Sequence, residues 1–160
     1  MDHRKFLEMA VDLSSASAEK WWFPAGALIV RGDIIISEWI SIWSILNDPT
    51  AHAETVAIRK ACEKLKTSDL SWCTLYSSMQ PCVMCYSAAV WAKISQIMFI
   101  CEKTPDMVSK WYYEWTTNIF ALNRENGNKI VISQNSEYRE WAMLAVKKWE
   151  AVNNILTTWA

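Results

Sequence analysis

The chain has 160 residues, of which 52% are hydrophobic and 21% are charged. These values exclude an intrinsically disordered chain and suit one domain, residues 1–160, built around a single hydrophobic core. The 16 basic and 17 acidic residues leave a formal net charge of -1. A protein that grips the nucleic-acid backbone usually carries a basic excess, so this balance favours a small-molecule substrate over nucleic acid.

Membrane-spanning and export segments are not predicted. No apolar run approaches the roughly 20 residues needed to cross a bilayer, and the first 13 residues lack the apolar block of a secretory signal. The five cysteines are an odd number, which favours free thiols and a metal-binding pair over disulfides. Cys62, Cys73 and Cys101 lie in apolar contexts and are expected to pack in the core. We therefore expect a cytoplasmic protein with no membrane contact.

Hydrophobic periodicity predicts the first elements of the chain. Phe6, Met9 and Leu13 recur at helical spacing, which is typical of an amphipathic packing helix over residues 3–16. After it, two short runs of β-forming residues flank the polar tripeptide 31–33. That arrangement indicates a β-hairpin.

Turn and proline residues predict where the later elements begin. Asp48-Pro49-Thr50 indicates a turn, with Thr50 as the N-cap of the next helix. Pro81 ends a strand and fits the first turn of the helix that follows it. The expected helices are 3–16, 51–65, 81–93, 105–113 and 137–152, and the expected strands are 27–30, 34–37, 73–76, 97–101 and 129–133. Alternation after the hairpin predicts an α/β fold, a three-layer α-β-α sandwich with a five-stranded mixed sheet.

Two short motifs carry candidate metal ligands. The first is His52-Ala53-Glu54, and the second, after 26 intervening residues, is Pro81-Cys82-Val83-Met84-Cys85. Each motif alone is weak, since a Cys-x-x-Cys pair can also be a redox pair or half of a zinc knuckle. Together they supply one nitrogen and two sulfur ligands, the donors that zinc prefers. Three protein ligands leave the fourth tetrahedral position for water, as in catalytic zinc sites.

Glu54 suits proton transfer rather than metal binding. Its side chain and that of His52, two positions apart at a helix start, cannot share one helical face, so one binds metal while the other reaches a water on that metal. Zinc lowers the pKa of such a water enough to make it reactive near neutral pH. Cys82 and Cys85 are three apart at the start of a second helix, where the helix N-terminus favours thiolate charge. We expect one zinc per chain.

The joint pattern His-x-Glu followed by Pro-Cys-x-x-Cys resembles the signature of zinc-dependent base deaminases. At these residues the chain resembles the cytidine deaminase-like superfamily. The likeness extends to residues 24–30, 48–54 and 91–92, where the sequence looks most like bacterial guanine deaminases. It covers about residues 1–125. The resemblance implies a five-stranded sheet between helices, one zinc per chain and a homodimer, often with exchanged C-terminal segments.

The resemblance also assigns roles to individual residues. It places the metal ligands at His52, Cys82 and Cys85 and the proton shuttle at Glu54. For the substrate, it implies a backbone contact to the base at Ala53, an aromatic pocket wall at Trp91, and an acidic residue that recognises ring N–H groups at Glu114. The corresponding substrate-binding residue in the family, usually Asn, falls on Ser41.

Several positions depart from the family pattern. Ala25 stands where the family usually has Phe, and Gln80 replaces a common Glu. The family tends to have glycine, which is used at positive φ or close backbone approach, where this chain has Trp22, Trp39, Trp72 and Trp111.

These observations favour hydrolytic deamination of a free nucleobase, with guanine converted to xanthine and ammonia. The alternatives are a tRNA adenosine deaminase, a cytosine or other nucleoside deaminase, and a non-catalytic fold that zinc only stabilises. Near-neutral charge and the absence of a Lys/Arg run argue against the tRNA substrate.

Overall fold

The computed structural model describes residues 2–127 and 129–153. Its helices are α1 (His3–Glu19), α2 (Trp43–Leu46), α3 (Ala53–Leu65), α4 (Val83–Trp91), α5 (Pro105–Ser109), α6 (Ile119–Glu125) and α7 (Arg139–Asn153), and its strands are β1 (Gly26–Arg31), β2 (Ile34–Ile40), β3 (Cys73–Met79), β4 (Gln96–Cys101) and β5 (Val131–Gln134). The strands form one sheet in the order β2-β1-β3-β4-β5. Strand β1 pairs antiparallel with β2 and β3, whereas β4 is parallel to β3 and β5.

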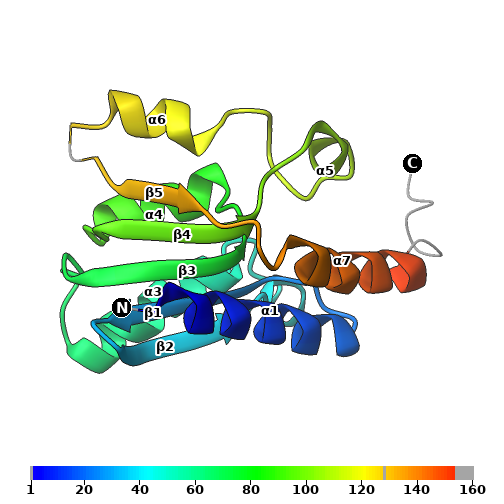
Figure 1. The fold of residues 1–160 in the computed structure, drawn as a ribbon, viewed down its shortest axis with the longest axis horizontal. Helices are drawn as coiled ribbons and strands as arrows, with labels where there is room; N and C mark the ends of the chain where they lie inside the picture. The colour runs from blue at the N-terminus through cyan, green and yellow to red at the C-terminus, as the bar shows by residue number, and fades with distance from the viewer. Residues whose placement is uncertain (1, 128, 154–160) are drawn as a thin grey trace.

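Helices cover both faces of this sheet (Figure 1). On one face α1 packs against β1 and β3, and α7 lies beside α1 and reaches β4. On the other face α3 packs against β1 and β2, with α4 next to it. The predicted fold class, a three-layer α-β-α sandwich with a five-stranded mixed sheet, is confirmed. Strand β3 is buried at every position because helices cover both of its faces.

Gly26 allows α1 to lie close to the sheet. A Cβ at this position would lie 2.5 Å from both the backbone oxygen of Ala10 and the Cβ of Leu13. Such a distance is shorter than any ordinary van der Waals contact, so a larger residue would push α1 away. The Gly26 N–H is satisfied on the sheet side by donating to Ser78 Oγ at 3.1 Å.

The starts of α3 and α4 differ from the sequence prediction. His52, not Thr50, is the N-cap of α3, because the Asp48 carboxylate accepts from both the backbone N–H and the hydroxyl of Thr50. Thr50 is therefore held in the turn before the helix. Similarly, α4 has Cys82 as its N-cap, so Pro81 precedes the helix instead of lying in its first turn. Both shifts bring a candidate metal ligand to the N-cap.

The region after β4 departs most from the prediction. The helix that begins at Pro105 ends at Ser109, four residues early, and Trp111 adopts a left-handed φ of 60°. Of the four tryptophans that stand where the family tends to have glycine, only Trp111 has a positive φ; Trp22, Trp39 and Trp72 do not. Helix α6 was not predicted; its N-cap Asn118 accepts from the Phe120 N–H.

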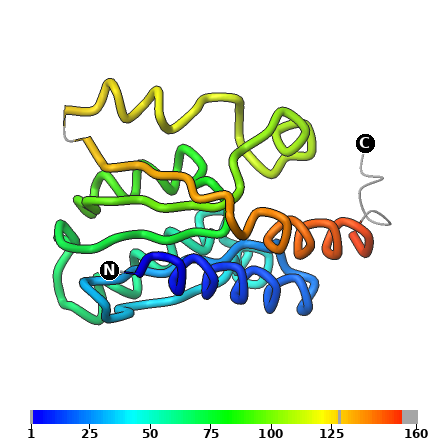
Figure 2. The backbone as a smooth tube through the Cα atoms, viewed as in Figure 1, coloured from blue at the N-terminus to red at the C-terminus, as the bar shows by residue number. Residues whose placement is uncertain are grey.

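Helix α7 packs on its own chain, side by side with α1 (Figure 2). The Trp149 Nε1–H donates to the backbone oxygen of Trp21 at 3.2 Å, which ties the two helices together near their C-terminal ends. Residues 154–160, which belong to the C-terminal segment predicted to exchange between subunits, lie outside the described residues. No helix within residues 2–127 and 129–153 has the length and apolarity to cross a bilayer.

Candidate active site

Two helix N-termini meet at the candidate metal site. His52 is the N-cap of α3 and Cys82 the N-cap of α4, and neither side chain caps its own helix. Both residues have extended backbone conformations, which leaves the imidazole and the thiol free to point between the helices. Cys85, in the first turn of α4, adds the third donor. The positive ends of the helix dipoles favour negative charge on the thiols at this point.

The donor atoms have the spacing of a zinc site. The Nδ1 atom of His52 lies 3.6 Å from the Sγ atoms of both Cys82 and Cys85. A tetrahedral zinc with bonds of about 2.3 Å to sulfur and about 2.0 Å to nitrogen would separate such atoms by roughly 3.5 Å. All three donors lie within 4.8 Å of one another. The residues therefore fit a zinc ion that would be held by three protein ligands.

Glu54 lies beside the three donors without joining them. Its side chain is buried, accepts a hydrogen bond from Ser77 Oγ at 3.2 Å, and lies 3.6 Å from the Cys85 sulfur. Burial raises the pKa of the Glu54 carboxyl, and the nearby Cys82 charge raises it further. A raised pKa shifts the titration of the carboxyl toward the neutral range in which a general acid–base group works best.

The two thiols differ in their ease of ionisation. The hydrogen bond from Cys85, assisted by His52, lowers the pKa of the Cys82 thiol to about 5. Burial raises the pKa of the Cys85 thiol. Burial would lower the pKa of His52, but the Cys82 hydrogen bond and the Glu54 charge outweigh it and raise that pKa. A thiolate is the form that binds metal.

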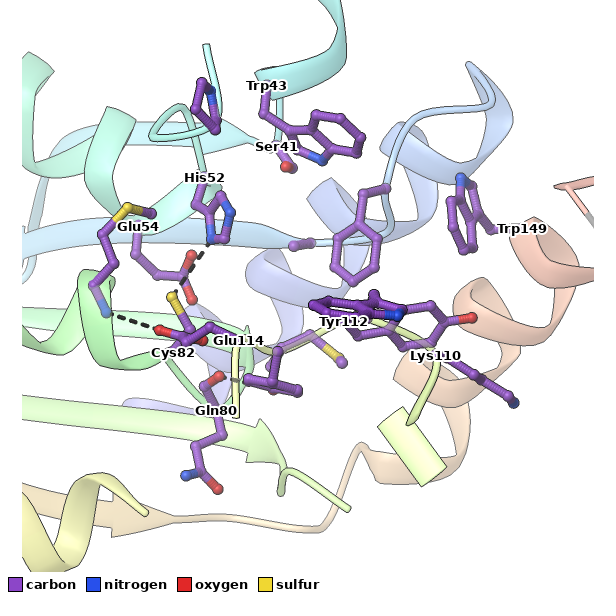
Figure 3. A pocket seen from close by; sticks show the side chains of 17 residues that line it. Ser41, Trp43, His52, Glu54, Gln80, Cys82, Lys110, Tyr112, Glu114 and Trp149 are labelled. Carbon is purple, nitrogen blue, oxygen red and sulfur yellow. Dashed lines mark hydrogen bonds between the residues drawn. The ribbon is translucent and has the colours of Figure 1, made fainter. Parts of the chain in front are cut away.

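A cavity of about 510 Å³ opens onto these residues (Figure 3). His52, Glu54 and Cys82 line its inner end. Ser41, Ala25 and Glu114 also line the cavity. The remaining lining residues are Phe23, Trp43, Pro49, Met79, Gln80, Met84, Lys110, Trp111, Tyr112, Tyr113 and Trp149. The volume lies in the range that encloses small-molecule ligands.

Two of the four predicted substrate-binding residues, Ser41 and Glu114, line the cavity, whereas Ala53 and Trp91 are not among its lining residues. Ser41 is buried in the cavity wall, and Ala53 is buried between His52 and Glu54, at the first position of α3. Glu114 lies in the loop between α5 and α6. Its Oε1 accepts from the Met84 N–H, at the N-terminus of α4, at 3.2 Å (Figure 3).

Trp91 does not lie in the cavity, contrary to the prediction. Its side chain is 86% exposed at the C-terminal end of α4. A helix rises about 1.5 Å per residue, so Trp91 sits roughly 12 Å along the axis from the first helical residue, Val83. Since Cys82 and Cys85 hold the N-terminal end of α4 at the metal site, its last residue points away from it.

The sequence pattern of the cytidine and deoxycytidylate deaminase zinc-binding region matches residues 1–101, well over half of the chain. The match contains Glu54 and all three donors of the candidate zinc site. The chain belongs to this deaminase family. Within the family, His52, Cys82 and Cys85 can therefore be read as a zinc site and not as a redox pair.

Two relatives illustrate the range of substrates in this deaminase family. The chain is 42% identical over 105 residues to a guanine deaminase of Bacillus subtilis, and this stretch covers 65% of this chain and 67% of the relative. It is 40% identical over 99 residues to a tRNA-specific adenosine deaminase of Aquifex aeolicus, covering 62% and 66% of the two chains. The matches thus span about two-thirds of each relative's own length.

Solved structures similar to this chain also include a guanine deaminase and a protein from work on tRNA deaminases. The Bacillus subtilis guanine deaminase structure is 33% identical, with a TM-score of 0.65, and covers 81% of this chain and 98% of that one. A structure from work on A-to-I editing by tRNA:A34 deaminases is 25% identical, with a TM-score of 0.74, and covers 88% and 99%. Guanine deaminase of Nitrosomonas europaea, at 22% identity and a TM-score of 0.80, shares the fold over 91% of this chain and 83% of that one.

Several residues of this deaminase's site were missed from the sequence. Ser77, which donates to Glu54, had no distinct sequence signal, because the same strand also contains Thr74 and Ser78. Phe23, Tyr112 and Trp149 line the outer cavity and contact one another edge to face. No sequence signal linked them, because Phe23 and Trp149 lie at opposite ends of the chain. Tyr113 anchors the loop by donating to the Gln80 backbone oxygen at 2.8 Å.

Proposed function

We propose that this chain is a zinc-dependent guanine deaminase that converts guanine and water to xanthine and ammonia. The observation that carries the proposal is that Glu114 lines the same cavity as His52, Glu54 and Cys82. An ionised carboxylate only accepts hydrogen bonds. Guanine as a free base keeps ring N–H donors that can face such a group, whereas no ring nitrogen of adenosine carries a hydrogen. The site is thus better matched to guanine than to adenosine.

The proposed reaction divides the work between the metal and two carboxylates. Zinc, held by His52, Cys82 and Cys85, would lower the pKa of a water molecule, so that the water can lose a proton and act as a nucleophile near neutral pH. Glu54 would carry one proton of the attacking water to a ring nitrogen of guanine as the new C–O bond forms. It would then carry the second proton, from the hydroxyl now on that ring carbon, to the amino group as the C–N bond breaks and ammonia leaves. Its burial beside the donors and its hydrogen bond from Ser77 support this role.

Four groups would hold the base in the cavity. Glu114 would accept from its ring N–H groups, and charge-assisted hydrogen bonds of this kind are roughly twice as strong as neutral ones. Ser41, shorter than the family's Asn, would bind directly or through a water. The backbone of Ala53 would contact the base beside the metal. The aromatic rings of the cavity wall, among them Phe23, replace Trp91 as candidates for contact with the purine.

tRNA adenosine deamination remains the second candidate function, because the 40% identity to the Aquifex aeolicus enzyme is close to the 42% identity to guanine deaminase. Such an enzyme must bind the phosphate backbone around a splayed-out base. The net charge of -1 offers little general attraction for RNA.

One assay separates these functions. Ammonia release is measured with guanine, cytosine, adenine, their nucleosides and a tRNA anticodon stem-loop, each with the zinc-loaded protein and its Glu54→Gln variant. We expect guanine to react fastest, with a raised KM because Ser41 is short, and cytosine to react weakly. Preference for the stem-loop would replace the proposal with the tRNA function. Stoichiometric zinc with no ammonia from any substrate would favour a non-catalytic fold.

We also propose that the protein is a homodimer. Large aromatic side chains on its surface support this, since exposed apolar patches commonly mark interfaces; Trp91 and Trp111 are each 86% exposed. Sedimentation equilibrium tests the proposal. A dimer mass at micromolar concentrations is expected, and a monomer mass across that range would contradict it.

A further inference from the structure

The segment 110–114 forms one side of the cavity, and each of its last three residues makes a side-chain hydrogen bond to another part of the chain. Tyr113 donates to the Gln80 backbone oxygen at 2.8 Å, and Glu114 accepts from the Met84 N–H at 3.2 Å. Both of these contacts tie the segment to the region between β3 and α4. The third contact comes from α7, because the Tyr112 hydroxyl donates to Glu150 Oε1 at 2.7 Å.

Glu150 is a junction between α7 and this segment. The same oxygen that accepts from Tyr112 lies 2.9 Å from Lys110 Nζ, and the Glu150 side chain is only 21% exposed. Lys110 is also paired with Asp106 at 2.8 Å. A carboxylate that is partly shielded from water and holds both a hydroxyl and an ammonium group is worth more than an exposed surface pair.

The residues beside this junction build the outer wall of the cavity. The ring centroids of Phe23, Tyr112 and Trp149 lie 5.3 to 5.7 Å apart, and each pair meets edge to face. These distances are favourable for aromatic pairs. Trp149 precedes Glu150 in the chain, and Tyr112 donates a hydrogen bond to Glu150, so the ring cluster and the Glu150 contacts form one unit. Figure 3 shows Tyr112, Lys110 and Trp149 together at the end of the cavity away from His52 and Cys82.

We propose that Glu150 is a positioning residue, which holds Tyr112 and Lys110 against α7 and thereby fixes the outer wall of the active-site cavity. It lies outside residues 1–101, the stretch that matches the family pattern. The inference rests on the proposed function in one respect, namely that the cavity binds a base. Glu150 touches neither the metal donors nor the inner cavity. It acts on the substrate through Tyr112 and Trp149. Because Glu150 already orders this wall in the free protein, less conformational entropy is lost when the substrate binds.

The test compares Glu150→Ala with wild type in two measurements. The first is hydrogen exchange without substrate at the amides of Trp111 and Tyr112, which donate to Val108 and Met107 backbone oxygens at 3.1 and 2.9 Å. We expect exchange there to accelerate about tenfold, with the β3 amides unchanged. The second is steady-state kinetics on the base that reacts fastest. KM should rise about 5- to 10-fold with kcat nearly unchanged, as for a loss of binding order.

Three further variants sharpen the result. Tyr112→Phe, which removes only the hydroxyl, should reproduce much of the effect of Glu150→Ala. Glu150→Gln, which can still accept from Tyr112 but loses the charge opposite Lys110, should fall between Glu150→Ala and wild type. Glu140→Ala is the matched control, because Glu140 is an exposed glutamate in the first turn of the same helix. It should leave both measurements unchanged.

Two outcomes overturn the proposal. One is unchanged exchange at Trp111 and Tyr112 in Glu150→Ala. The other is acceleration that includes β3, which would mark a general loss of stability. Because exchange is measured without substrate, a chain that deaminates no base would contradict the proposed function while leaving the role of Glu150 supported or refuted on its own. Guanine turnover with unchanged exchange would refute only Glu150.

Discussion

The two ends of the cavity are built in different ways. At the inner end, His52 and Cys82 are N-caps of helices packed on the sheet, and Cys85 and Glu54 are buried behind them. At the outer end, Phe23, Tyr112 and Trp149 come from a loop after α1, a loop after α5 and the last turns of α7, and all three are only partly buried. The first end is anchored by the core, and the second by contacts between peripheral segments.

This difference separates the chemistry from the choice of substrate. The inner end lies within residues 1–101, which match the deaminase family, and the relatives similar to this chain include both a guanine deaminase and a tRNA-specific adenosine deaminase. The outer end uses residues on both sides of that boundary and includes α7, whose Trp149 reaches back to α1. Variation at the periphery can therefore change what enters the cavity without disturbing the metal donors.

Cys82→Ala should have the largest effect, because it removes a metal donor at the rigid end. We expect loss of stoichiometric zinc, loss of activity and a lower melting temperature together, since metal-binding energy is also folding energy. Elemental analysis and thermal unfolding measure these changes. Cys62→Ala, which alters a cysteine outside the site, serves as the control and should retain zinc. A Cys82→Ala protein with full zinc content would contradict the ligand assignment.

Glu54→Gln should separate proton transfer from metal binding at the same inner end. Gln is nearly isosteric, and Glu54 is not among the metal donors. We expect kcat to fall by about 10²- to 10⁴-fold or more. The range is the usual loss when a general acid–base group is removed. Zinc content and melting temperature should stay close to wild type. Near-normal turnover would show that the proton moves by another route.

Glu114→Gln tests the proposed recognition of guanine by the Glu114 carboxylate. A hydrogen bond to a charged group contributes roughly 1.5–3 kcal/mol, so kcat/KM for guanine should fall about 10- to 100-fold. Zinc content should not change. Glu125→Gln, an exposed glutamate on α6, is the control. Equal activity of Glu114→Gln and wild type on guanine would remove Glu114 from the proposed site.

Trp111→Gly tests strain at the outer end. Trp111 has a φ of 60° and is 86% exposed, so it loses little packing when replaced. Glycine adopts positive φ without steric conflict, and we expect the free energy of unfolding to rise by up to about 1 kcal/mol. Denaturant titration measures the change. Trp115→Gly, also exposed but without positive φ, should gain nothing. If Trp111→Gly lowered the free energy of unfolding as much as Trp115→Gly does, backbone strain at Trp111 would be contradicted.

Trp91→Ala should have the smallest effect on activity. Its side chain lies at the far end of α4 from the metal donors and points into solvent. KM and kcat for the preferred base should therefore remain within about twofold of wild type, as for most surface substitutions away from a site. A large rise in KM would return Trp91 to the substrate site that the family resemblance predicted.

The sequence by itself determined the inner end of the cavity. The spacing of His52, Cys82 and Cys85 follows from zinc chemistry and from the short helical segments that carry them, so local pattern was sufficient. The same holds for the alternation of helices and strands and thus for the mixed sheet. The N-cap positions were misplaced by one or two residues, because competing hydrogen bonds such as those of Asp48 to Thr50 decide where a helix begins.

Only the tertiary structure decided the outer end. Nothing in the sequence connects Phe23 with Trp149 or Tyr112 with Glu150, because these pairs meet only after α7 has packed beside α1. Trp91 shows the converse: it belongs to the same helix as Met84, which lines the cavity, but its own side chain faces solvent. Contacts between distant segments depend on how whole helices pack, and packing responds to the shape of the entire core rather than to any local pattern.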